Sequence, residues 1–258
     1  MIENLSMFIR QHLFALKVSL ALVPALLLPI CANASVTIMG SRIIYPEQAR
    51  SVDVQFKNND AIPYVIQSWF DNGNKDSQPD GQVNTPFIIT PPVFRIQPKA
   101  GQIAKIILNN AVSQVQDRES VYWFNTLQIP PSNIAKDNAQ NAMLVVLRNR
   151  MKVFYRPKSI GAPKNILKGI KVTSFYQANK GMGIEIDNPQ PWHASLVDVV
   201  LKVGNQSLKR DADMVSPFSR QTYWFNNSKR LKGSGVITVS AVNDQGAKIS
   251  ENFTVEVN

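Results

Sequence analysis

The chain has 258 residues and a formal net charge of +10, with one cysteine and two histidines. A single cysteine excludes a disulfide within the chain, and so few His and Cys residues leave no zinc motif of ordinary spacing. The positive charge would suit nucleic acid, but the Lys and Arg residues are scattered and no nucleic-acid-binding motif accompanies them. We therefore expect no nucleic-acid partner, no metal and no cofactor, and we interpret the charge as solvated strand faces or attraction to an acidic partner.

The first 34 residues predict a secretory signal peptide, with cleavage between Ala34 and Ser35. They run from positive charge through an apolar segment to a small-residue site: Arg10, Lys17, residues 18–30 and Ala32-Asn33-Ala34. The apolar segment is too short, and too interrupted by proline, for a membrane span. Lipoprotein processing at Cys31 is the weaker alternative, because Ile30 is bulky where a small residue is expected. We expect an exported chain with no stable membrane insertion.

Residues 35–157 predict an all-β domain. Short runs of alternating apolar and polar residues are separated by turn residues, and no segment shows a sustained helical period. The runs at sandwich spacing are SVTIMGSRIIY, SVDVQFKN, PYVIQSWF, FIITPPVFRI, QIAKIIL, ESVYWFNTLQI and the stretch from Gln140. They predict seven strands, and Trp69 in the third run would suit the core tryptophan of an immunoglobulin-like sandwich.

The last run, Gln140 to Pro157, is long for a strand and unusual in composition. Its first half is apolar on both faces, with Met143, Val145 and Leu147 on one face and Leu144 and Val146 on the other. Its second half carries a cationic stripe of Arg148, Arg150 and Lys152. We interpret the run as a row of apolar side chains beside a place for something anionic. The pattern leaves open which apolar face the domain keeps for its own core.

Residues 158–165 predict a linker, and residues 166–258 predict a second all-β domain without obvious repeat of the first. His193 follows Pro191-Trp192 in a predicted turn and is better explained as a surface or packing residue than as a catalytic base. No phosphate loop, nucleophile elbow or paired-carboxylate motif is present. We therefore expect no enzyme. The disfavoured alternative is an exported hydrolase, which would need a pocket of carboxylates that only folding brings together.

Several segments occur together in one order: SRIIYP, NNDAIPYVIQSW, TPPVFR, QDRES, IPP, MKVFYRP and VNDQGA. This set resembles the periplasmic pilus-assembly chaperones of the chaperone-usher pathway, the PapD-like family, over nearly the whole chain after residue 34. The resemblance implies two immunoglobulin-like β-sandwich domains in an L-shaped (boomerang) arrangement with a cleft between them. The short segment 132–140 and the lack of cysteine after residue 34 resemble the subclass with a short F1–G1 loop.

In this family the chaperone lends its strand G1 to a pilin subunit that lacks a final strand. By resemblance, strand G1 spans about residues 140–156, and its donor side chains are Met143, Val145 and Leu147. Arg42 and Lys152 match the pair that anchors the subunit's C-terminal carboxylate. The resemblance therefore implies a periplasmic chaperone that binds, folds and caps pilin or fimbrial subunits.

Two further groups of residues match the family. Glu119, Arg156 and Asp244 match an ionic network between the domains. A surface that contacts the outer-membrane usher in relatives matches Pro63, Val65, Gln67, Thr90, Pro92, Val93 and Ile129. The implied partners are thus pilin subunits and the usher, and a self-capping dimer is expected when the chaperone is free. The alternative function is that of a secreted immunoglobulin-like structural or glycan-binding adhesive protein.

Overall fold

The computed structural model describes residues 35–81, 84–109, 112–131 and 145–257. The predicted signal peptide, the segment 132–140, Met143 and Leu144 lie outside these residues. Within the described ranges, no helix is long and apolar enough to cross a membrane.

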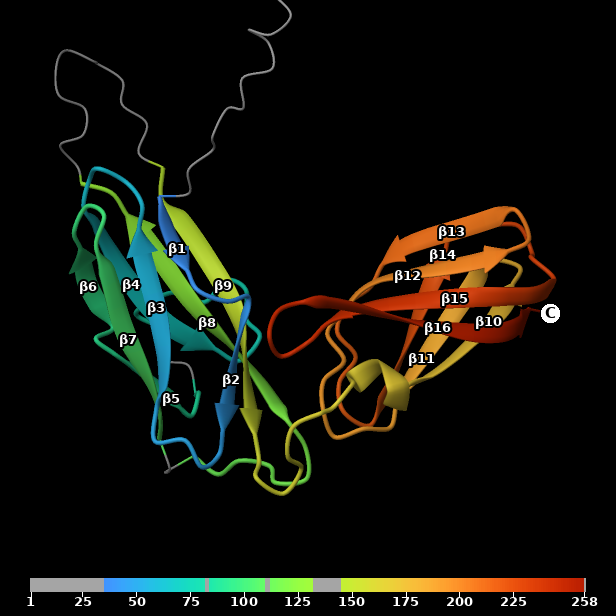
Figure 1. Ribbon diagram of the computed structural model, residues 1–258, viewed down its shortest axis with the longest axis horizontal. Helices are drawn as coiled ribbons and strands as arrows, with labels where there is room; N and C mark the ends of the chain where they lie inside the picture. Colours follow the sequence, from blue (N-terminus) through green and yellow to red (C-terminus); the bar gives the residue numbers. More distant parts are fainter. Residues whose placement is uncertain (1–34, 82–83, 110–111, 132–144, 258) are drawn as a thin grey trace, which may run out of the picture. The chain divides into compact units, whose positions relative to one another are not determined.

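The first sandwich consists of strands β1 to β9 in two sheets (Figure 1). One sheet has the order β1 (Val36–Ile38), β3 (Val52–Asn58), β7 (Gly101–Leu108) and β5 (Phe87–Thr90). The other has the order β2 (Arg42–Pro46), β9 (Leu147–Arg156), β8 (Ser120–Ile129), β4 (Tyr64–Asp71) and β6 (Val93–Ile96). Neighbouring strands are antiparallel except β2 and β9, which run parallel.

Two of the predicted runs are each divided between the two sheets. The first changes sheet between β1 and β2, where Gly40 has a φ of +89°, a conformation that glycine adopts without a steric penalty. The fourth changes sheet between β5 and β6, at the double proline that follows Thr90. The seven predicted runs therefore form nine strands. Each of the two divided runs turns at its middle residues and contributes one strand to each sheet.

The core of the first sandwich lies between its sheets. Strand β3 buries Val54 and Phe56 and exposes the residues between them, as strand alternation requires. Aromatic rings fill much of the remaining space, with centroids 5.1 to 5.5 Å apart in the contacts among Tyr45, Phe70, Phe87 and Phe124. This packing supplies the rigid support on which the outer faces of the sheets rest.

Trp69 packs outside that core cluster. The residues of β4 that face the core are Tyr64, Ile66 and Phe70, so Trp69 lies on the opposite face of the strand. Its indole Nε1 donates to Ser77 Oγ at 3.1 Å. The tryptophan that would suit a sandwich core instead belongs to a polar cluster on the outer face of the five-stranded sheet.

The second sandwich also has two sheets and a core of its own. One sheet has the order β10 (Lys171–Gln177), β11 (Gly181–Asn188) and β14 (Ser219–Phe225); the other has β13 (Gln206–Asp211), β12 (Leu196–Val203), β15 (Gly233–Val242) and β16 (Lys248–Val257). A short 3₁₀ helix, Ile166–Gly169, precedes β10. The prediction of an all-β chain with two sandwich domains is confirmed. Its exact boundaries at residues 157 and 165 stay a prediction.

One buried asparagine occupies the same local position in each sandwich. Asn58 ends β3, Asn188 ends β11, and neither is exposed to solvent. In both, the side-chain amide donates to the carbonyl oxygen four residues later at 2.8 Å, and Oδ1 accepts the backbone N–H two residues later. The two sandwiches thus share the same turn at the end of a strand, held by a buried asparagine. Their sequences do not reveal this shared turn, because it is formed by one side chain and by backbone groups.

Replacing either asparagine should destabilise its sandwich. We expect Asn58→Ala and Asn188→Ala each to lower the free energy of unfolding by about 1 to 3 kcal/mol, because buried backbone carbonyls lose their donor. Chemical denaturation followed by tryptophan fluorescence measures this. Asn74→Ala is the matched control, since Asn74 makes a similar turn contact in an exposed loop. Equal losses in all three variants would contradict the structural role of the two buried asparagines.

Candidate functional site

Strand β9 has one edge that is only partly covered. Strand β8 pairs with it from Leu147 to Tyr155, whereas β2 pairs with it only from Lys152 to Arg156. Residues 147–151 therefore have no hydrogen-bonded strand on the β2 side within the described chain. Backbone groups along such an edge are free to pair with a strand from another protein.

The apolar side chains next to this edge are exposed. Val153 and Tyr155 are buried in the core, and Met151 packs against it. The β8–β9 register shows no shift, so Leu147 lies on this same core-facing side of the strand, yet it is 47% exposed. Val145, just before the strand, is 67% exposed. The core-facing side of β9 thus continues beyond the end of the core. The sequence left open which face of the strand points toward the core, and the structure shows that Leu147 lies on that face.

Arg42 and Lys152 lie side by side on the opposite face of the sheet. They are directly paired residues of the parallel β2–β9 ladder. Arg42 Nη1 donates to the carbonyl oxygen of Val242 at 2.9 Å, and its buried Nε has no hydrogen-bond partner within the described chain. Neither cation forms an ion pair with a carboxylate of the described residues.

The surroundings of this pair disfavour its two positive charges. Burial lowers the pKa of the Lys152 ammonium, the neighbouring Arg42 lowers it further, and Asp213 opposes the shift. Burial also lowers the pKa of Arg42, against the attraction of Asp244 and Glu119. An anion placed between the two side chains would relieve the repulsion and supply hydrogen-bond acceptors.

The two arginines that precede Lys152 on the same face of β9 already have partners within the domain. Arg150 forms two hydrogen bonds with the Asp71 carboxylate, at 2.6 and 2.9 Å, and its guanidinium lies 4.5 Å from the centre of the Trp123 ring. Arg148 donates to Asn125 Oδ1 at 2.8 Å. The sequence indicated one cationic stripe, whereas the structure divides it into an arginine paired with a carboxylate, an arginine hydrogen-bonded to an amide, and one available lysine. Asp71 and Asn125 come from other strands, so the run itself carried no sign of the pairing.

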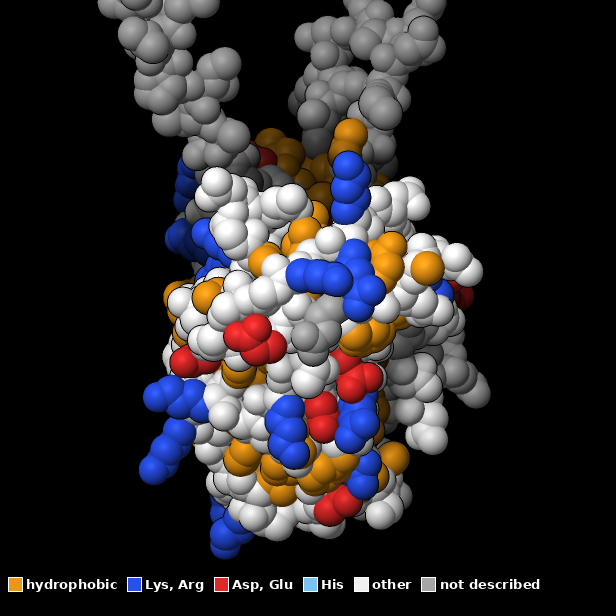
Figure 2. Space-filling view, turned by 90° about the vertical axis from the view of Figure 1, so that its right-hand side faces the viewer, with side chains coloured by type: hydrophobic (Ala, Val, Ile, Leu, Met, Phe, Trp, Pro, Cys, Tyr) orange, Lys and Arg blue, Asp and Glu red, His pale blue; other side chains and the backbone are white. Residues whose placement is uncertain are grey.

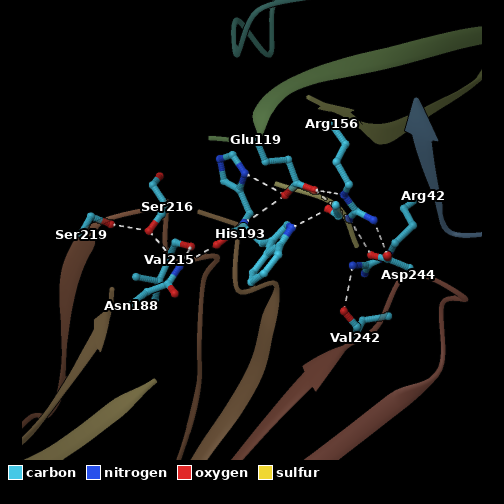
Figure 3. Close-up of polar contacts among 12 residues, drawn as sticks. Arg42, Glu119, Arg156, Asn188, His193, Val215, Ser216, Ser219, Val242 and Asp244 are labelled. Atoms are coloured by element: carbon cyan, nitrogen blue, oxygen red, sulfur yellow. Dashed lines mark hydrogen bonds and ion pairs between the residues drawn. The ribbon is translucent and has the colours of Figure 1, made fainter. Parts of the chain in front are cut away.

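A buried ionic network joins the two sandwiches (Figure 3). Arg156 donates to Glu119 Oε1 from Nε and Nη2 at 3.0 and 2.8 Å, and it reaches both carboxylate oxygens of Asp244 at 2.6 and 3.0 Å. Glu119 is 3% exposed and Arg156 is 7% exposed. Burial opposes the charge of Arg156, but hydrogen bonding and attraction to the two acids outweigh it and raise its pKa. The three residues predicted to meet do meet.

His193 is a fourth member that the sequence did not assign. Its backbone N–H and its ring Nδ1 lie 3.0 and 3.1 Å from Glu119 Oε2, and its ring packs against Phe154. Both carboxylate oxygens of Glu119 are therefore engaged. Arg156 of the first sandwich binds Oε1, and His193 of the second sandwich contacts Oε2. Of the two expected roles of His193, surface or packing residue, the structure shows the packing role, and a lone histidine in a turn gave no signal of its ionic partner.

The residues matched to the usher-facing surface come together around strands β4 and β6. Val65 pairs with Ile129, and Gln67 pairs with Val93 on the edge strand β6. Val65 and Val93 are 37% and 51% exposed. A shallow pocket beside them is lined by Pro63, Tyr64, Val65, Arg95, Ile129, Pro130 and Pro131. This is an exposed apolar surface at a sheet edge, separate from the open edge of β9.

The structure carries surfaces for binding rather than an assembled metal centre. No group of three or more His, Cys, Asp or Glu side chains in the described ranges could hold a metal ion. Figure 2 shows a face on which basic side chains are interspersed with acidic and apolar ones rather than gathered in one patch. The fold and the site together define a two-domain β-sandwich protein with an open strand edge next to an unneutralised cation pair.

Comparison with known proteins places the chain in a family. Residues 35–161 match the family described as "Pili and flagellar-assembly chaperone, PapD N-terminal domain", and residues 170–253 match "Pili assembly chaperone PapD, C-terminal domain". The chain belongs to this family of pilus-assembly chaperones, which are not enzymes. The predicted family and non-enzymatic class are confirmed, and the hydrolase and adhesive alternatives are set aside.

Similar proteins cover nearly all of the described chain. The probable fimbrial chaperone YadV of Escherichia coli (strain K12) is 34% identical over 222 residues, 85% of this chain and 89% of the relative. The chaperone protein MrkB of Klebsiella pneumoniae is 31% identical, over 86% of this chain and 92% of the relative. The crystal structure of the YadV chaperone has a TM-score of 0.70 at 30% identity, covering 86% of this chain and 100% of that chain.

Removing the central arginine of the ionic network should be costly. We expect Arg156→Ala to lower the free energy of unfolding by about 3 kcal/mol, because it leaves the buried Glu119 carboxylate without its main cation. Urea denaturation measures the loss. Lys105→Ala, which breaks the exposed pair with Asp53, serves as control and should cost less than about 1 kcal/mol. Similar losses for both variants would show that the buried network contributes no more than a surface pair.

Proposed function

We propose that this chain captures pilus subunits in the periplasm by lending them strand β9 and delivers them to the outer-membrane usher. One observation carries the proposal: the open edge of β9 leads directly to the unneutralised Arg42–Lys152 pair, in register with it. An incomplete immunoglobulin-like subunit needs the two things that this surface offers. They are a strand to complete its sheet and a fixed point for its chain end.

The donor strand supplies backbone hydrogen bonds and apolar side chains. Val145 and Leu147 are exposed and would enter the hydrophobic groove of the subunit, together with Met143, which lies outside the described residues. Burying each such side chain contributes roughly 1.5 to 3 kcal/mol. Binding therefore requires no ATP, since completion of the subunit's sheet supplies the free energy.

The cation pair anchors the subunit's C-terminal carboxylate. Charge-assisted hydrogen bonds from Arg42 and Lys152 to one carboxylate would satisfy the buried Arg42 Nε and relieve the repulsion between the pair. A fixed end also sets the register of the two strands, because a slip of one residue would turn every donor side chain away from the groove. The apolar side chains at the start of β9 would thus supply most of the affinity, and the cation pair at Lys152 would fix the register of the two strands.

The remaining surfaces serve geometry and delivery. The network of Glu119, Arg156 and Asp244 would fix the orientation of the domains, since buried ionic contacts specify geometry more reliably than they add stability. The exposed apolar surface at β4 and β6 would contact the usher. The open edge of β9 would be covered in the free chaperone by a self-capping dimer, which avoids an aggregation-prone edge.

The anchor can be tested with the cognate pilin, defined as the pilin that co-purifies with this chain from periplasm and is identified by mass spectrometry. Co-expression should give a soluble one-to-one complex. Lys152→Ala and Arg42→Ala should reduce its yield about tenfold or more, because an unanchored carboxylate forfeits its charge-assisted bonds. Lys202→Ala and Arg50→Ala, at exposed positions, are the matched controls. An undiminished complex in the anchor variants would refute the anchor.

The donor strand can be tested separately. We expect Val145→Asp to weaken subunit capture strongly, because a carboxylate would have to enter an apolar groove. The free chaperone should stay folded, because Val145 is 67% exposed. Val115→Asp, at an exposed loop position, is the matched control. Circular dichroism checks folding and pull-down of the cognate pilin measures capture; loss of folding in Val145→Asp would instead assign this side chain to the chaperone's own core.

A further inference from the structure

The spacing of the cations on β9 raises a question of register that the anchor alone does not answer. Arg148, Arg150 and Lys152 alternate along a regular strand and therefore share one face. A subunit strand that slips by one residue exposes the wrong side chains, but a slip of two residues, about 7 Å, restores the correct face. In that slipped register the carboxylate of the subunit would lie beside Arg150.

Asp71 neutralises Arg150, so Arg150 does not compete with Lys152 for the carboxylate. The two side chains form a two-pronged pair, and Asp71 also accepts hydrogen bonds from Asn125 Nδ2 and from the backbone of Gly73, each at 2.7 Å. The Asp71 side chain is fully buried. Burial would raise the pKa of Asp71, but these hydrogen bonds and the Arg150 charge lower it below its ordinary value. Asp71 is thus a permanent anion at neutral pH.

Arg148 is held by the same cluster. Its guanidinium donates to Asn125 Oδ1 and Ser77 Oγ and lies 5.0 Å from the centre of the Trp69 ring. Ser77 in turn accepts the Trp69 indole N–H. Arg150 is thus paired with a carboxylate, and Arg148 is held by an amide oxygen, a hydroxyl oxygen and a ring face.

Lys152 differs from Arg150 in two respects. No carboxylate among the described residues forms an ion pair with Lys152, whereas Asp71 pairs with Arg150, and Arg42 stands directly beside Lys152 on β2. Strand β2 begins at Arg42, so no strand residue occupies the corresponding place beside Arg150. A carboxylate therefore meets two available cations at one position of β9 and a neutralised pair two residues earlier.

We propose that Asp71 is a positioning residue that selects the register of subunit capture by masking Arg150, so that the carboxylate anchors only at Lys152 and Arg42. The proposal rests on the proposed function and adds a residue to it. Asp71 touches no part of the subunit; it acts through the arginine that it neutralises.

A small carboxylate tests the masking directly. N-acetylglycine, a mimic of a peptide C-terminus, is titrated into the isotope-labelled chaperone, and the side-chain NMR signals of Arg and Lys are followed. In the wild type we expect Arg42 and Lys152 to shift and Arg150 to stay unchanged; in Asp71→Asn the Arg150 signal should shift too. Asp198→Asn is the matched control, a buried aspartate paired with Lys248 in the second sandwich.

The outcomes of the titration separate the two hypotheses. A shift of Arg150 in the wild type equal to that of Lys152 would overturn the masking by Asp71 and leave the anchor intact. No shift of Arg42 or Lys152 in the wild type would overturn the anchor itself and the register proposal with it.

Cross-linking tests the register in the complex. Leu147→Cys is paired with single cysteines in the cognate pilin, one at the groove position expected to face it and one two residues along. Wild-type Asp71 should give one product, and Asp71→Asn should add the product displaced by two residues. The double variant Asp71→Asn/Arg150→Gln should return to one product, which a merely structural role of Asp71 does not predict. A single product in Asp71→Asn would overturn the proposal.

A shortened pilin keeps the proposal testable if Asp71→Asn does not fold. With the unaltered Asp71 chaperone carrying Leu147→Cys, removal of the last two residues of the pilin should shift the cross-link by two residues, because the carboxylate follows Lys152. An unshifted cross-link at undiminished yield would show that Arg150 can anchor the carboxylate, which contradicts masking.

Discussion

The pairing of β9 with β8 is the constraint on which the rest of the site depends. It runs without a shift from Leu147 to Tyr155, so every side chain of β9 has its face assigned by its position. One end of the strand lies within the sandwich core and the other extends past it. The same alternation that buries Val153 and Tyr155 therefore leaves Leu147 exposed, on the part of the strand that the proposed function assigns to subunit capture. The part that packs in the core and the part proposed to bind are consecutive in one strand.

The opposite face of β9 is organised by charge neutralisation. Buried cations are tolerable when carboxylates, amides and ring faces surround them, as they do at Arg148, Arg150 and Arg156. Arg42 and Lys152 lie side by side without a carboxylate partner within the described part of the chain, so the folded protein retains the repulsion between two neighbouring cations at that point. A ligand that removes this repulsion is favoured there over the position of Arg150, which Asp71 already neutralises.

Sequence was informative where a single strand carries its own pattern. The alternation of the runs predicted the sandwich class, and the motif order led to residues 42, 119, 152, 156 and 244, whose contacts the structure now shows. Apart from the motif order, the sequence did not predict contacts between side chains on separate strands. Nothing near Asp71 indicated Arg150, and nothing near His193 indicated Glu119, because those pairs exist only after the sheets and the two sandwiches assemble. The split runs were missed because alternation does not record a change of sheet at Gly40.

The parallel pairing of β2 with β9 also has a consequence for folding. Arg42 lies near the start of the first sandwich and Lys152 near its end, and they become neighbours only when the last strand of the sandwich docks beside one of the first. We expect contacts so distant in sequence to form late, because closing a long loop costs entropy before any contact compensates for it. A partly folded or truncated chain can expose apolar strands, but it cannot present the cation pair. Under the proposed function, only the completed domain could hold a subunit by its chain end, and unfinished copies could not engage subunits in the proposed register.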